Sequence, residues 1–185
     1  MLKIGITGSF ASGKSSVLHY LESKGYNSFS CDECVRELYN DQIVVSTIIE
    51  AFPELESFNK QKLSKIIYAD KKKRQKLELI IHPLVATKLE SFLSVNNTEK
   101  KVFIEIPLLF EAGWEKYCDI IVNLYCDKNI REKRAAERGI KTELFTEIDK
   151  AQLPESIKIQ SADINIDTSQ AWNKVTDQLE ELLDL

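Results

Sequence analysis

The sequence predicts an α/β fold in which a parallel β-sheet is flanked by helices. Short apolar segments without clean alternation, typical of parallel strands covered on both faces, begin near residues 2, 101 and 120. Helical patterns separate them, and alternating strands and helices build parallel sheets. A glycine-rich turn also joins the first apolar segment to the first helical one. The ligand crevice is therefore expected beyond the carboxyl ends of the strands.

The first thirty residues predict a strand–helix–strand unit. "LKIGIT" at 2–7 is the first strand, and residues 14–24 carry apolar side chains at helical spacing. Gly25 supplies a stop signal, "YNSFS" at 26–30 is the second strand, and Asp32 follows its carboxyl end.

Residues 35–100 differ, because they show helical spacing and few glycines as far as "NNTEK". "KVFIEI", "DIIVNLY" and "ADINI" then predict three more strands, with charged helices at 129–138 and 142–153 and an amphipathic helix in "QAWNKVTDQLEELL". The predicted organisation is one unit over 1–185, in which 1–34, 101–130 and 156–185 form the core, 35–100 a helical insertion and 131–155 a helical lid.

The 185 residues are 43% hydrophobic and 29% charged, with a formal charge of −4. This balance lacks the basic surplus of nucleic-acid-binding proteins. The longest apolar segment, "VFIEIPLLFEAGW", contains two glutamates and is too short for a membrane span. With no signal core at the start, a cytoplasmic protein is expected, with no obligate protein partner.

Four unevenly spaced cysteines, Cys31, Cys34, Cys118 and Cys126, favour reduced thiols. "CDEC" has the spacing of a redox or zinc pair, and the alternative is a pair of small apolar residues. The second interpretation is favoured, since no other close Cys/His pair exists for zinc.

A phosphate-binding loop is the most specific feature of the chain. Gly8, Gly13, Lys14 and Ser15 complete G-x-x-x-x-G-K-[ST] between a predicted strand and a helix. Inward N–H groups and the positive helix end make an anion cradle, Lys14 reaches the β- and γ-phosphates, and the Ser15 hydroxyl ligates Mg²⁺. The predicted ATP- and phosphate-binding residues here are Gly8, Ser9, Phe10, Ala11, Ser12, Gly13, Lys14, Ser15 and Ser16. This motif specifies the fold further, as a three-layer P-loop fold, and the family resemblance given below implies that of a P-loop kinase.

Asp32 is the candidate carboxylate that orients an acceptor hydroxyl and takes its proton. The alternative is a helix N-cap for "ECVREL", and the two roles are compatible.

Arg134 and Arg138 lie four residues apart, so they share one helix face and either swing onto phosphates or form a solvated face. "KKKR" at 71–74 favours a solvated face, with support for an anionic substrate as the alternative. His82, in apolar "LELIIHPLV", is either a partly buried histidine or a substrate contact.

These residues resemble the dephospho-CoA kinase family. The similarity runs through the P-loop, "CDECVREL", "LELIIHPLV", "EIPLLFEAG", "REKRAAERG", "AQLP" and "SADINI". "IIHP" together with "PLLFE" is its most specific part. The resemblance implies transfer of the ATP γ-phosphate to the ribose 3′-hydroxyl of dephospho-CoA with Mg²⁺.

The resemblance also implies roles for individual residues. Asp32, Lys14 and Arg138 would be catalytic, Arg134 and Arg138 would be lid arginines, and the insertion would bind the CoA moiety. The implied substrate-binding residues are Asp32, Arg36, His82, Leu108 and Glu111.

The chain departs from the family pattern at several positions. Ser9, Phe10 and Ala11 stand where Gly-Ile-Gly is usual, Ser30 and Glu105 replace aspartates, Ile148 replaces a lid arginine, and Asp167 stands near a usual asparagine. Lid electrostatics would then depend more on Arg134, Arg138 or Lys150.

Two alternatives remain open at this point. Another small-molecule or nucleotide kinase would share the P-loop, Asp32 and the lid, but would not predict "IIHP" with "PLLFE". A nucleotide-dependent switch is the other. A guanine-reading Asn-Lys-x-Asp has no match, because the similar "NKQK" at 59–62 ends in lysine.

Overall fold

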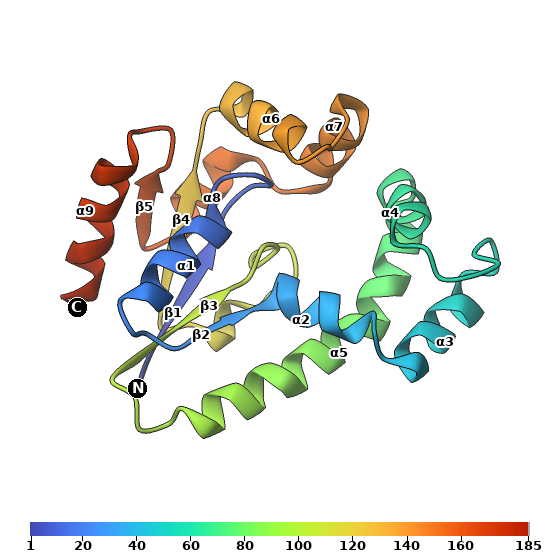
Figure 1. Cartoon of the computed structure of the whole chain (residues 1–185), viewed down its shortest axis with the longest axis horizontal. Coiled ribbons are helices and arrows are strands. Elements are labelled where there is room, and N and C mark those ends of the chain that lie inside the picture. The colour runs from blue at the N-terminus through green and yellow to red at the C-terminus, as the bar shows by residue number, and fades with distance from the viewer. Residues whose placement is uncertain (185) are drawn as a thin grey trace. The chain divides into compact units, whose positions relative to one another are not determined.

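The computed structural model describes residues 1–184, and the chain divides into two compact units. The first unit comprises Met1–Ser28 and Thr98–Leu185, and the second comprises Phe29–Asn97. The first contains most of the sheet, and the second is helical (Figure 1).

A five-stranded sheet of order β2-β3-β1-β4-β5 organises the fold. Its strands are β1 (Leu2–Thr7), β2 (Ser28–Ser30), β3 (Lys101–Glu105), β4 (Ile120–Tyr125) and β5 (Ile164–Asp167). β1 runs parallel to β3 and to β4, with Ile6 opposite both Glu105 and Val122. The last four residues of β1 are all buried, as expected for a strand covered on both faces. The predicted α/β fold with a parallel sheet is thus confirmed.

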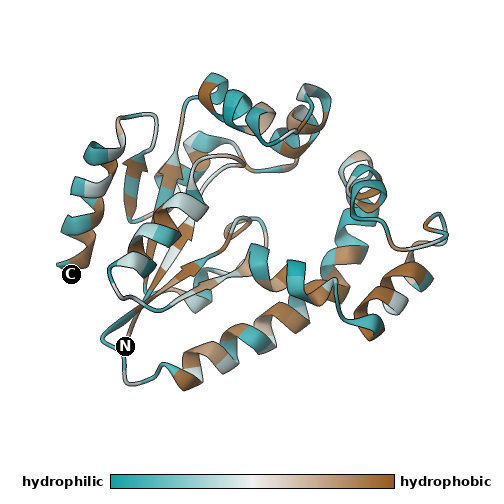
Figure 2. Cartoon of the chain, in the orientation of Figure 1, coloured by the Kyte–Doolittle hydropathy of each residue, from teal (hydrophilic) through white to brown (hydrophobic). Residues whose placement is uncertain are grey.

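Helices flank the sheet of the first unit. They are α1 (Lys14–Ser23), η1 (Glu115–Tyr117), α6 (Lys128–Glu137), α7 (Thr142–Ala151), α8 (Glu155–Ser161) and α9 (Trp172–Leu183). α1 and α9 place Val17, Leu21, Val175 and Leu179 in one core cluster with Ile4 and its neighbours on the strands. Figure 2 shows the hydrophobic residues of the strands, and helices that carry hydrophobic residues on one side and hydrophilic residues on the other.

The second unit is built on one long helix. Its helices are α2 (Cys31–Leu38), α3 (Gln42–Ala51), α4 (Lys60–Ala69) and α5 (Lys71–Val95). α5 contacts the other three through a buried row at helical spacing, formed by Leu77, Ile81, Val85 and Leu89. Asp70 caps α5 by accepting the N–H of Lys72 at 2.8 Å.

The structure corrects one alternative and one helix end. Ser30 rather than Asp32 caps α2, because the Ser30 hydroxyl accepts the N–H of Glu33 at 3.2 Å. The predicted helix at 142–153 ends at Ala151, and α8 follows as a separate helix. Pro154 explains the break, since the residue before a proline is steered out of the helical conformation.

Candidate active site

The loop from Gly8 to Ser16 follows the carboxyl end of β1, and its backbone is shaped for an anion. Gly8 has φ 144°, and a Cβ there would lie 2.3 Å from the Leu124 carbonyl oxygen, so glycine is required. Gly13 precedes α1 in a left-handed conformation, and no side chain within residues 1–184 caps this helix. The helix N-terminus therefore offers its N–H groups to an anion.

Lys14 is folded back over the loop. Its buried Nζ donates to the carbonyl oxygens of Gly8, at 2.9 Å, and Ser9, at 3.2 Å. Ser15 and Ser16 are exposed in the first turn of α1. A cation and two hydroxyls thus surround the anion cradle.

A pocket of about 400 Å³ adjoins the loop. It is lined by Gly13, Ser16, Arg134, Glu137, Arg138, Thr168, Gln170 and Trp172. Arg134 donates to the Thr168 carbonyl at 2.7 Å, and the Thr168 hydroxyl donates to the Ser12 carbonyl at 2.5 Å. The structure therefore brings together the P-loop, both predicted lid arginines and the segment after β5. Arg138 is exposed, whereas Arg134 is half-buried and held by Thr168.

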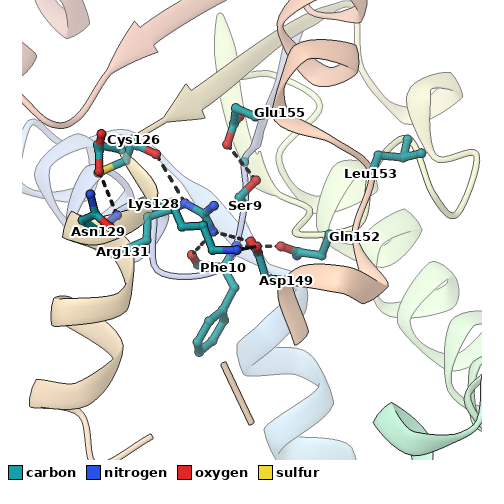
Figure 3. Close-up of polar contacts among 12 residues, drawn as sticks. Ser9, Phe10, Cys126, Lys128, Asn129, Arg131, Asp149, Gln152, Leu153 and Glu155 are labelled. Carbon is teal, nitrogen blue, oxygen red and sulfur yellow. Dashed lines mark hydrogen bonds and ion pairs between the residues drawn. The ribbon is translucent and has the colours of Figure 1, made fainter. Parts of the chain in front are cut away.

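A polar network joins the P-loop to the helices after β4 (Figure 3). Arg131 donates to the Phe10 carbonyl at 3.2 Å and to Asp149 at 2.8 Å, and Gln152 accepts the Phe10 N–H at 2.8 Å. The Ser9 hydroxyl donates to Glu155 at 2.8 Å. The residues that join Ser9 and Phe10 in this network, Arg131, Asp149, Gln152 and Glu155, were not predicted from the sequence, because contacts across 18 to 146 positions leave no periodic signal in one sequence.

Asp149 is charged within this network. Burial raises the pKa of its carboxyl, but hydrogen bonds from Lys128 and Arg131 outweigh burial and hold the pKa below its ordinary value. The Arg131–Asp149 contact is therefore an ion pair at neutral pH.

Two predicted substrate residues lie in the segment after β3. Leu108 is half-buried, and its carbonyl accepts the N–H of Ala112 at 2.9 Å. The Glu111 carboxylate accepts the N–H of Leu153 at 2.8 Å and pairs with Lys158 at 3.2 Å. Glu111 thus has a structural role in this unit, and its substrate role stays a prediction.

The other predicted substrate residues belong to the second unit. Asp32 is exposed in the first turn of α2, and Arg36 pairs with Glu33 at 3.2 Å. His82 is half-buried on α5, where burial lowers its pKa against the opposing charge of Glu78. His82 is consequently neutral at pH 7.

The "CDEC" cysteines do not have the properties of a redox pair. Cys31 and Cys34 are both buried on α2, and burial raises the pKa of the Cys34 thiol. Reactive thiols need the opposite shift. Within residues 1–184 there is also no group of three or more His, Cys, Asp or Glu side chains arranged to hold a metal ion.

None of the helices described over residues 1–184 has the length and apolar character needed to cross a membrane.

The class of protein follows from the fold and the site. A parallel sheet, a G-x-x-x-x-G-K-S loop leading into an uncapped helix and an arginine-lined pocket define a P-loop kinase fold. The family model described as dephospho-CoA kinase matches residues 2–173. The chain belongs to the dephospho-CoA kinase family.

The chain is similar to individual proteins of known sequence or structure. A dephospho-CoA kinase of Rickettsia felis is 44% identical over 184 residues, covering 99% of this chain and 96% of the relative. The crystal structure of TT1252 from Thermus thermophilus has a TM-score of 0.84 at 28% identity, covering 99% and 96% of the two chains. A dephospho-CoA kinase structure from Campylobacter jejuni has a TM-score of 0.67 at 23% identity, covering 97% and 96%, and shows the shared fold.

Proposed function

We propose that this chain is an ATP-dependent kinase that phosphorylates the ribose 3′-hydroxyl of dephospho-CoA, giving coenzyme A and ADP. The observation that carries the proposal is the family match over residues 2–173, which includes an intact P-loop. A cytoplasmic location is part of the same proposal.

The P-loop residues bind the triphosphate. The N–H groups of the loop and the N-terminus of α1 stabilise negative charge on the phosphates. Lys14 exchanges its contacts with the Gly8 and Ser9 carbonyls for phosphate oxygens. Its ammonium is already held within the loop, so little side-chain freedom remains to be lost on binding.

The two pocket arginines have different tasks. Arg134 is fixed by the Thr168 carbonyl and shapes the pocket beside the loop. Arg138 is exposed, and its guanidinium stabilises the negative charge that develops on the phosphate oxygens during transfer. A permanently charged fork suits this role because phosphoryl transfer depends mainly on positioning and charge stabilisation.

The residues present fit a magnesium ion that arrives with ATP. Mg²⁺ prefers oxygen ligands and is commonly held by one or two protein groups together with substrate phosphates and water. The exposed Ser15 hydroxyl, one residue after Lys14, supplies such an oxygen. When bound, the ion neutralises charge on the phosphates.

The acceptor is bound and activated by residues that are similar to the family's substrate-binding residues. Asp32 orients the 3′-hydroxyl and accepts its proton, since an exposed carboxylate is available to a substrate. Arg36 and His82 bind the dephospho-CoA, and Arg36 suits an acceptor that carries phosphate charge. Leu108 and Glu111 border the acceptor in the segment after β3. The helical insertion provides the surface for the CoA moiety, and residues 131–155 act as the lid.

The experiment that tests this function compares acceptors. ADP release from MgATP is measured with dephospho-CoA, cytidylate, shikimate, gluconate and no acceptor, and the products are identified by mass. The proposal expects ADP release that depends on dephospho-CoA, together with CoA. Dependence on another acceptor would instead support a different small-molecule kinase, and release without any acceptor would support a nucleotide switch.

A further inference from the structure

Arg131 connects the P-loop to both helices that follow β4. Its guanidinium donates to the Phe10 carbonyl, to the Asp149 carboxylate and, through Nε at 3.3 Å, to the Cys126 carbonyl. We propose that Arg131 is a positioning residue that holds the tip of the P-loop in its nucleotide-binding conformation. This inference rests on the proposed function only in taking the P-loop as the nucleotide site.

The tip of the loop is held on both sides of Phe10. Its N–H donates to Gln152 Oε1 at 2.8 Å, and its carbonyl accepts from Arg131 Nη1 at 3.2 Å. Figure 3 shows both contacts. The orientation of both peptide groups that flank Phe10 therefore depends on side chains from the segment after β4.

Arg131 is built into the unit rather than lying on its surface. It is 5% exposed, its guanidinium pairs with Asp149 at 2.8 Å, and it lies 5.7 Å from the centre of the Phe145 ring. A buried cation must be paired and hydrogen-bonded to be tolerated, and the Arg131 guanidinium donates to three acceptors that lie in different directions. The planar fork of arginine matches this set of acceptors, which a lysine ammonium cannot reproduce.

The loop needs this support because its next residue is in an unfavourable conformation. Ala11 has φ 62°, a left-handed conformation that costs free energy for any residue with a Cβ. Ala11 packs in one buried cluster with Ala135 of α6 and Phe145 of α7. Packing of Ala11 and the Arg131 contacts together hold the loop in a shape that the backbone alone disfavours.

Lys128 provides a matched control on the same helix. Its Nζ lies 2.9 Å from Asp149 Oδ2, so it pairs with the same carboxylate as Arg131. It is exposed and, among residues 1–184, makes no hydrogen bond to the P-loop. Arg131→Met and Lys128→Met each remove one cation beside Asp149, but only the first releases the Phe10 carbonyl.

The test is the affinity of the whole protein for MgADP, measured by calorimetric titration. Arg131→Met should weaken binding by about tenfold or more, as expected for a lost hydrogen bond to a charged group, and Lys128→Met by less than about twofold. Arg131→Lys should recover part of the loss. In steady-state assays, Arg131→Met should raise KM for ATP while KM for dephospho-CoA stays within about twofold of wild type.

A purely structural role would lower the unfolding temperature without changing the affinity of the folded protein. Wild-type affinity in folded Arg131→Met, or equal weakening by Lys128→Met, would overturn the proposal. If Arg131→Met does not fold, Arg131→Lys and Gln152→Ala decide the matter, and unchanged MgADP affinity in both would refute it. Because ADP binding needs no acceptor, a failure to phosphorylate dephospho-CoA would count against the proposed function alone.

Discussion

The Nζ of Lys158 lies 3.2 Å from Oε1 of Glu111, and the Lys158 side chain is completely buried. The same glutamate oxygen accepts the N–H of Leu153 at 2.8 Å. One carboxylate thus ties the segment before α8, and α8 itself, to the segment after β3. Within residues 1–184 the Lys158 ammonium has this ion pair but no hydrogen bond that meets ordinary geometric criteria.

Removing one partner of this pair should destabilise the protein strongly. Lys158→Met leaves the Glu111 carboxylate without its cation, and the expected loss of unfolding free energy is about 3 kcal/mol. The double variant Lys158→Met/Glu111→Gln should recover most of that loss, since it removes both charges and keeps a side-chain oxygen for the Leu153 N–H. Urea unfolding of both variants measures this. A double variant no more stable than Lys158→Met would contradict the ion-pair explanation.

The left-handed conformation of Ala11 predicts opposite tolerance for two substitutions. In Ala11→Gly the relief of about 1–2 kcal/mol of backbone strain is offset by a lost buried methyl group and a more flexible unfolded chain. Its stability should therefore stay within about 1 kcal/mol of wild type. Ala11→Val should lose more than about 2 kcal/mol, because β-branching is poorly compatible with positive φ and the site is packed. Equal thermal stability of the two variants would show that Ala11 is not strained.

Burial of His82 predicts a pH effect in the second unit. Its folded-state pKa is lowered from 6.5 by burial, so the unfolded chain binds the proton more readily. The contribution of neutral His82 to stability is therefore present above about pH 6.5 and is lost as pH falls from there through the lowered folded-state pKa. An NMR titration of the imidazole, assigned with His82→Gln, measures that pKa. A midpoint above 6.5 would contradict the prediction.

Asp32→Asn tests the acceptor side of the proposed mechanism. The change keeps the size of an exposed side chain and removes the proton acceptor. Turnover should fall by about a hundredfold or more, which is typical for loss of general-base assistance, while ATP affinity changes little. Single-turnover kinetics at saturating ATP measure the transfer step separately from ATP binding. Turnover within about threefold of wild type would remove Asp32 from that role.

The sequence was most informative where local chemistry determines structure. The apolar strand segments and the Gly-Lys-Ser ending of the loop were sufficient to predict the parallel sheet and the anion cradle. The helical spacing of residues 35–100 likewise predicted helices there, and α3, α4, α5 and the second half of α2 lie in that segment.

Contacts between distant residues were not predictable in this way. Nothing in the sequence around Lys158 distinguishes it from other lysines. Its complete burial depends on Glu111, which lies 47 positions earlier in the chain. Arg131 was one of several charges on a predicted charged helix, and no role was predicted for it. Asp32 was one alternative for the cap of α2. Ser30 and Asp32 are both good capping residues, and only the exact residue at which α2 begins decides which of them is the cap.

The central claim is that the P-loop delivers the γ-phosphate of ATP to dephospho-CoA. ATP radiolabelled at the γ-phosphate is incubated with dephospho-CoA and either wild-type protein or Lys14→Ala, and the label is located after chromatography. Label in CoA with the wild type, and at least about a hundredfold less with Lys14→Ala, is the predicted result. Label released only as inorganic phosphate, or equal transfer by Lys14→Ala, would contradict it.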